Sequence, residues 1–214
     1  MPQMREDVLE ATRNLTGKTI PVHIDLQSKQ VILSQPEMLE LLGAAERIAV
    51  GNCACREDED RCENPLEVCL ALDEEARTKI ADHGWRPITF ERAMELLGET
   101  HRLGLVHMAY RRTFADEPTP REISFVCSCC SCCCWPLNGL RRFDYHDAIT
   151  ESAYVATFDE SKCAGCGTCV ERCPFGAFTL PDGLEKATFT ETKCFGCGLC
   201  VGSCPTEAIG FVQR

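Results

Sequence analysis

The chain has 214 residues, a formal net charge of −11 and 18 cysteines. Its length allows two domains, and its acidity argues against nucleic acid as a partner, because phosphate contacts need a basic surface. The first residues are charged, and no apolar run of membrane length precedes the cysteines. We therefore expect no membrane span and a cytoplasmic protein of anaerobic or microaerobic cells, with its thiols reduced or bound to iron.

Helical signals predominate in the first part of the chain. Pro36 suits the first turn of a helix whose apolar stripe runs to Ile48. Thr89 caps a further predicted helix, which Gly104 ends. The sequence therefore predicts a mainly helical N-terminal domain over residues 1–150.

A first group of four cysteines follows the first predicted helix. Downstream of it, Asn64 as N-cap and Pro65 as first helical residue predict a second helix that runs to about Ala81. This helix would place its cysteine about one turn from its start. Three loop thiols and one helical thiol are thus expected to point at one region: Cys53, Cys55, Cys62 and Cys69.

A second group occupies six of eight consecutive positions. A short predicted strand over residues 123–126 leads into it, and Trp135 and Pro136 close it. Packing does not require such a run, although one or two of its members can be core residues. Adjacent cysteines diverge, which suits ligation of different irons or different clusters. The members are Cys127, Cys129, Cys130, Cys132, Cys133 and Cys134.

These two groups together offer ten thiols, enough for two further [4Fe-4S] clusters. We expect one or two additional iron–sulfur clusters here, which requires the two segments to meet in space. Zinc binding is one alternative, and redox thiols or persulfide handling is another. The Cys-x-Cys-Arg and cysteine-run motifs loosely resemble poorly described iron–sulfur proteins of anaerobes, a resemblance that implies no activity.

Residues 137–151 are polar and are expected to connect this domain to a second one, over residues 151–214. That second part contains two motifs of identical spacing, C-x2-C-x2-C-x3-C-P. Three cysteines of one loop suit three corners of a [4Fe-4S] cube, and the fourth reaches the other cube. Zinc usually takes two cysteine pairs set well apart, and disulfides fit the spacing less well. We therefore predict two [4Fe-4S] clusters with crossed ligands, one held by Cys163, Cys166, Cys169 and Cys204, the other by Cys194, Cys197, Cys200 and Cys173.

Residues 152–214 resemble a bacterial-type two-cluster ferredoxin, with both motifs complete. The resemblance implies a ferredoxin-like βαββαβ dicluster module with pseudo-two-fold symmetry, so the expected fold class of the whole chain is α+β. Residues 157–163 repeat as residues 188–194, and residues 177–180 and 208–212 are the expected returning strands. Glycines inside the loops let the backbone approach the inorganic sulfurs: Gly165, Gly167, Gly196 and Gly198.

The sequence favours an electron-transfer protein or subunit that passes single electrons through these clusters. Residues 1–150 carry 17 Lys+Arg against 25 Asp+Glu, and residues 151–214 carry 5 against 8, so both parts are acidic. Such a surface suits docking on a basic patch of a redox partner protein or oxidoreductase complex.

Two other functions stay open. One is a redox enzyme with an unusual N-terminal iron–sulfur or thiol site that the ferredoxin module feeds. The other is a metal- or sulfur-handling protein or a sensor. We assign no catalytic residue, because we find no dinucleotide fingerprint, phosphate loop or Ser-His-Asp pattern. Whether the chain is an enzyme therefore stays open.

Overall fold

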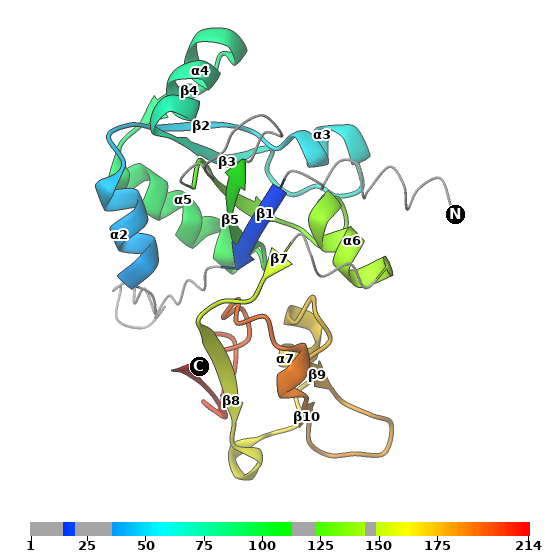
Figure 1. Cartoon of the computed structure of the whole chain (residues 1–214). Helices are drawn as coiled ribbons and strands as arrows, with labels where there is room; N and C mark the ends of the chain where they lie inside the picture. The colour runs from blue at the N-terminus through cyan, green and yellow to red at the C-terminus, as the bar shows by residue number, and fades with distance from the viewer. Residues whose placement is uncertain (1–14, 20–35, 113–122, 144–148) are drawn as a thin grey trace.

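The computed structural model describes residues 15–19, 36–112, 123–143 and 149–214 (Figure 1). Within these ranges, a seven-stranded sheet with flanking helices forms a larger N-terminal part, and two two-stranded sheets form a smaller C-terminal module. No helix in the described ranges has the length and apolar character needed to cross a membrane.

The larger part contains seven strands and five helices among the described residues. In chain order they are β1 (Leu15–Thr19), α2 (Pro36–Ala44), β2 (Ile48–Asn52), α3 (Ala54–Glu59), β3 (Glu67–Leu72), α4 (Asp73–His83), β4 (Arg86–Ile88), α5 (Phe90–Arg102), β5 (Val106–Arg112), β6 (Phe125–Cys129), α6 (Trp135–Phe143) and β7 (Ile149–Thr150).

The large sheet has the strand order β4-β2-β3-β6-β5-β1-β7. All neighbouring strands are antiparallel except β1 and β7, which are parallel. The inner strand β3 is buried from Val68 to Leu72, because helices or cysteine loops cover both of its faces. The sheet therefore brings the two cysteine groups together: β3 carries Cys69, and its neighbour β6 carries Cys127 and Cys129.

The prediction of a mainly helical N-terminal domain is wrong, although the broader α+β class agrees with the mixture of helices and strands. The cap signal at Asn64 and Pro65 does not begin a helix; the chain enters β3 instead, and α4 starts only at Asp73. A short apolar run fits a buried strand as well as a helix, and here pairing with β2 and β6 decides for the strand.

Two of the predicted helices are confirmed. Pro36 begins α2, and the Thr89 hydroxyl accepts a hydrogen bond from the Arg92 backbone N–H at 3.2 Å, which caps α5. The helix α2 is shorter than expected, because it ends at Ala44 and Ile48 already begins β2. The predicted polar connection over 137–151 is wrong in its first half. Residues 135–143 form α6, whose Leu137 and Leu140 are buried.

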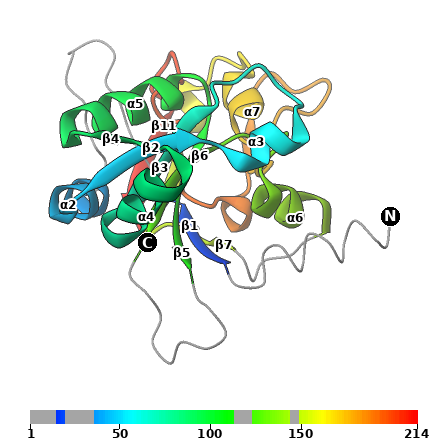
Figure 2. The same cartoon turned by 90° about the horizontal axis from the view of Figure 1, so that it is seen from above.

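The two faces of the large sheet have different coverings. Alternate residues such as Val50, Leu70 and Val126 pack with α2 and α5 in one core. The opposite face contains Ala71 and Phe125 and meets α4 through a small second core. Figure 2 shows α2 and α5 together on one side and α6 on the other.

The C-terminal module begins where β7 ends. It contains β8 (Tyr154–Phe158), the 3-10 turn η1 (Glu160–Lys162), α7 (Thr168–Arg172), β9 (Phe178–Thr179), β10 (Thr188–Phe189), the 3-10 turn η2 (Glu191–Lys193) and β11 (Ile209–Gln213).

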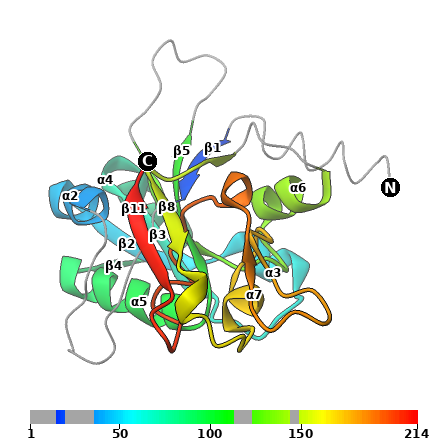
Figure 3. The same ribbon diagram turned by 90° about the horizontal axis from the view of Figure 1, so that it is seen from below.

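Two antiparallel pairs frame the module. β8 pairs with β11, and the two strands run side by side in Figure 3; β9 pairs with β10. The strands that return after each cysteine loop, β9 and β11, confirm the predicted returning strands at residues 177–180 and 208–212. The strand pairing therefore has the predicted pseudo-symmetry. Only the first half contains a helix, α7, whereas residues 199–203 of the second half form turns, so the second helix of the expected βαββαβ pattern is not formed.

Candidate metal centres

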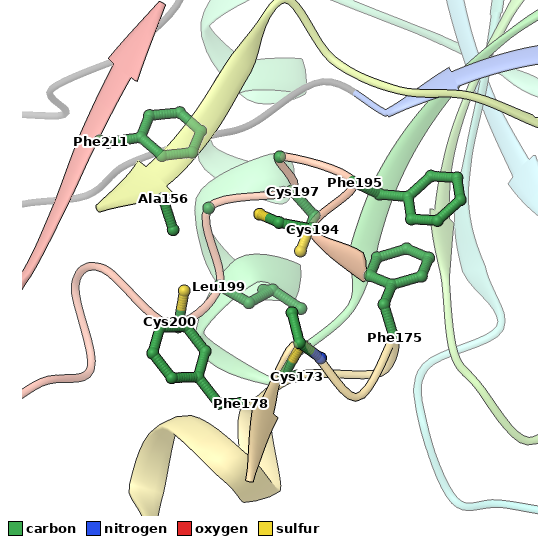
Figure 4. Close-up of a pocket in the computed structure, with 13 residues that line it drawn as sticks. Ala156, Cys173, Phe175, Phe178, Cys194, Phe195, Cys197, Leu199, Cys200 and Phe211 are labelled. Atoms are coloured by element: carbon green, nitrogen blue, oxygen red, sulfur yellow. The ribbon is translucent and has the colours of Figure 1, made fainter. Parts of the chain in front are cut away.

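The fourth cysteine of the first motif lies with the first three of the second. Cys173, Cys194, Cys197 and Cys200 line one small cavity, and Figure 4 shows their side chains converging on it. We call these four the inner set, because the last three are each only 8% exposed. Burial raises the pKa of the Cys197 thiol to about 12, so this thiol stays protonated until a metal displaces the proton.

The other four motif cysteines line a second cavity: Cys163, Cys166, Cys169 and Cys204. We call them the outer set, because Cys166 is exposed. A hydrogen bond with the Thr168 hydroxyl lowers the pKa of the Cys166 thiol. The structure thus groups the eight cysteines in the crossed arrangement expected from sequence; their ligation of clusters stays a prediction.

Backbone amides point at sulfurs in both halves of the module. The Ala177 N–H donates to Cys173 Sγ and the Ala208 N–H donates to Cys204 Sγ, each at 3.3 Å. Such bonds stabilise thiolate ligands and tune cluster potentials.

Glycines make the cysteine loops tight. Gly165 and Gly196 both have φ near +69°, and a Cβ on either would stand 2.0 Å from a backbone carbonyl oxygen, that of Glu185 or Tyr154. Glycine is therefore required at both positions because another backbone segment packs closely against them.

The N-terminal cysteines form two separate groups, not one. The first is a group of six thiols around one cavity, in which each thiol shifts the pKa of two neighbours, in the order Cys53, Cys55, Cys134, Cys129, Cys127, Cys69 and back to Cys53. We call it the six-thiol ring. All six border a cavity of about 230 Å³ whose remaining lining includes Trp85, Phe125 and Trp135.

Tyr110 completes the ring's surroundings. Its hydroxyl lies 3.7 Å from Cys129 Sγ and 3.9 Å from Cys134 Sγ. Burial raises the pKa of this phenol, so it stays protonated and can donate to sulfur.

The second N-terminal group is much more compact. Its sulfur atoms all lie within 4.8 Å of one another, and its members are Cys62, Cys130, Cys132 and Cys133. We call it the four-thiol group. Burial tends to raise the pKa of Cys62, but hydrogen bonds from the Asn64 backbone and side chain lower it to about 6. Cys62 is thereby prepared to act as a thiolate ligand.

This division differs from the arrangement expected from sequence. Cys62 was expected to share one region with the other three cysteines of its group, but it lies apart from Cys53, Cys55 and Cys69. The cysteine run is also divided, because neighbours such as Cys129 and Cys130 face different groups. The pleat of β6 gives the reason for its first members: Cys127 and Cys129 are two residues apart and share one face.

A buried cation lies between the two groups, and sequence reasoning did not single it out. Arg56 is 1% exposed and donates from Nη2 to the Ser128 carbonyl oxygen at 3.1 Å and from Nη1 to that of Pro65. Burial tends to lower the pKa of Arg56, but the nearby sulfurs of Cys130, Cys53 and Cys62 in their charged form raise it overall. Its position directly after Cys55 was the available signal.

The module and the larger part share one hydrophobic core. Phe195, Cys197 and Leu199 of the inner loop pack with Cys129 and Cys134 of the six-thiol ring, and with side chains of β5 and α6. Phe195 also stacks on Phe175 at 4.6 Å between ring centroids (Figure 4). The inner set therefore lies on the side of the module that faces the ring.

Comparison with known proteins supports the module. Residues 162–209 match the family model of the 4Fe-4S dicluster domain. A 41-residue stretch is 46% identical to Protein Pixie of Drosophila melanogaster, and it covers 18% of this chain and 7% of that protein. The C-terminal part is thus a ferredoxin-type iron–sulfur module. The chain spans only a small fraction of this relative, and the matched family segment does not include the ten N-terminal cysteines.

Proposed function

We propose that the protein conducts single electrons from an external partner through the outer cluster and the inner cluster to an iron–sulfur centre in the six-thiol ring. The outer set would hold one [4Fe-4S] cluster and the inner set the other. The ring would hold a polynuclear iron–sulfur centre, because six thiols around a cavity of about 230 Å³ suit more than one metal ion.

One observation carries the proposal: Cys197 of the inner set shares a hydrophobic core with Cys129 and Cys134 of the ring. An electron that reaches the inner cluster therefore meets a dry, packed contact with the next centre. At the other end, the exposed Cys166 marks the outer cluster as the one that a partner can approach. The partner would be a redox protein or oxidoreductase complex with a basic patch, given the acidic chain.

The test is a reductive titration of the anaerobically purified full chain, followed by electron paramagnetic resonance. We expect the spectrum of the reduced inner cluster to be broadened by a second paramagnet in the ring. In the Cys127→Ser/Cys129→Ser variant that broadening should disappear, whereas the outer cluster should keep its signal. Equal spectra and equal electron uptake in the two proteins would show that electrons do not pass from the inner cluster to the six-thiol ring.

A second candidate function has its own supporting observation. The cavity at the ring is lined largely by apolar side chains, including Trp85, Phe125 and Trp135, and this is the character of a small-molecule site. The protein would then be a redox enzyme that reduces a small molecule at the ring. Reoxidation of the reduced protein by a small oxidant, abolished by ring substitutions only, would favour this function over electron transfer to a partner protein.

A further inference from the structure

The spacing of the sulfur atoms in the four-thiol group is that of ligands around a single ion. Cys62 Sγ lies 3.8 Å from Cys130 Sγ and 3.7 Å from Cys133 Sγ, and Cys132 Sγ lies 3.8 Å from Cys133 Sγ. A tetrahedral ion with zinc–sulfur bonds of about 2.3 Å holds its sulfurs about 3.8 Å apart. A [4Fe-4S] cube keeps its thiolates outside its corners, where they are much further apart.

We propose that Cys62, Cys130, Cys132 and Cys133 bind one zinc ion in a closed tetrathiolate site. This site is separate from the iron–sulfur clusters, and the proposal does not depend on the electron-transfer role. All four ligands come from the protein, which is the arrangement of structural zinc sites. Ion binding would release to solvent the protons of those ligands that are still thiols.

Burial and preorganisation support a closed site. Cys133 is fully buried and Cys130 is 5% exposed, and both pack against Leu105 in a small core of their own. Cys62 is held by the Asn64 side-chain amide, which donates to Cys62 Sγ at 3.3 Å. The Asn138 side-chain amide donates to the Cys132 carbonyl oxygen at 3.3 Å and so fixes the other ligand loop. Bonds of this kind around the ligands orient them before the metal arrives.

Arg56 is an independent indication that anions occupy this region. It is almost fully buried, and no carboxylate forms an ion pair with it within the part of the chain that the structure describes. Its side chain reaches Cys130 of the four-thiol group. A divalent ion with four thiolates has a net negative charge, which compensates a buried cation beside it. The charge thus argues for metal-bound thiolates, and the spacing argues for one ion.

The site joins two distant segments. Cys62 lies between α3 and β3, and the other three ligands lie between β6 and α6. Cys129 and Cys134, which flank those three, belong to the six-thiol ring. Zinc would therefore fix the loop on which the ring depends, a structural role that suits an ion without redox activity.

The experiment uses the full chain, purified anaerobically from iron-replete and zinc-replete cells. The wild type should contain one zinc per chain, with four sulfur neighbours at about 2.3 Å by zinc X-ray absorption. Cys62→Ser should lose most of that zinc. Cys55→Ser, which removes a neighbouring thiol of the ring instead, should keep it. Absence of stoichiometric zinc from the wild type, or retention of zinc in Cys62→Ser, would overturn the proposal.

A second variant covers the case in which Cys62→Ser does not fold. Structural zinc sites accept histidine in place of one cysteine. Cys132→His, at a partly exposed ligand position, should therefore keep zinc with three sulfurs and one nitrogen around it. An unchanged shell of four sulfurs in that variant would show that the zinc is bound elsewhere.

Discussion

Arg172 of the ferredoxin-type module donates from Nη2 to the carbonyl oxygen of His101 in α5, across a distance of 3.0 Å. The same guanidinium donates from Nη1 to the Arg102 carbonyl at 2.9 Å and from Nε to the Leu199 carbonyl of the inner loop at 3.4 Å. One side chain thus connects the end of α5, the helix α7 and the loop that carries Cys197 and Cys200. It fixes the position of the inner set against the larger part.

Replacing Arg172 with alanine should therefore loosen this junction. We expect a loss of about 1–3 kcal/mol, since hydrogen bonds from a charged group are lost. Faster hydrogen exchange of residues 194–200 would report it, with both clusters still assembled. Lys193→Ala, at an exposed position of the module, is the control. Identical exchange in the two variants would contradict the role assigned to Arg172.

A matched pair of glycine substitutions tests the packing of the outer loop. Gly165 and Gly183 both have positive φ, but only at Gly165 does an added Cβ collide with a backbone atom, Glu185 O at 2.0 Å. Gly183→Ala should cost about 1 kcal/mol through backbone strain alone. Gly165→Ala should in addition displace the loop and lower the iron content of the outer set. Equal iron content and equal Tm in the two variants would show that the close approach is unimportant.

The crossed grouping of the motif cysteines predicts which cluster each substitution damages. Cys173→Ser should alter the cluster of Cys194, Cys197 and Cys200, because Cys173 lines the same cavity as these three. Cys204→Ser should alter the outer cluster instead. Electron paramagnetic resonance of the reduced proteins distinguishes the two, since the inner cluster lies beside the six-thiol ring and the outer one does not. Damage confined to a cysteine's own loop would refute crossed ligation.

His107 predicts a pH dependence of stability. It is fully buried beside the Ser128 hydroxyl, which lies 3.3 Å from Nδ1, and burial lowers its pKa from 6.5 to about 4. The unfolded chain therefore binds a proton more readily than the folded one below pH 6.5. Stability should fall as the pH drops from 6.5 towards 4, by about 2 kcal/mol between pH 7 and pH 5.

The measurement is the Tm of the wild type and of His107→Gln at pH 7 and pH 5. Acid damage to the clusters affects both proteins and cancels in the comparison. The wild type should lose more of its Tm than the variant. A larger loss in the variant would mean that His107 is not the neutral, buried group described above.

The fold of the module was predictable from sequence because the spacing of its cysteines determines its local structure. Two complete motifs and a repeated flanking segment specified the loops and the returning strands β9 and β11. The large sheet was not predictable in the same way. The buried run from Val68 to Leu72 has no alternation of apolar and polar residues, so only its non-local pairing with β2 and β6 distinguishes it from a helix.

The sequence also indicated that the ten N-terminal cysteines act together, but not how they divide. Cys62 and Cys69 are close in sequence, yet a loop and a strand carry them to different groups. Within the cysteine run, Cys129 is the last residue of β6 and Cys130 follows the strand, so their side chains belong to different groups. Arg56 was missed because its position directly after Cys55 does not by itself reveal that it is buried.

In the proposed function, the electron path continues from the module into the six-thiol ring. The most direct test is the iron and acid-labile sulfide content of the anaerobically purified full chain, measured beside the Cys127→Ser/Cys129→Ser variant. We expect more iron in the wild type than the eight atoms of two [4Fe-4S] clusters, and a decrease to about eight in the variant. Eight irons in both proteins would contradict it and would end the path at the ferredoxin-type module.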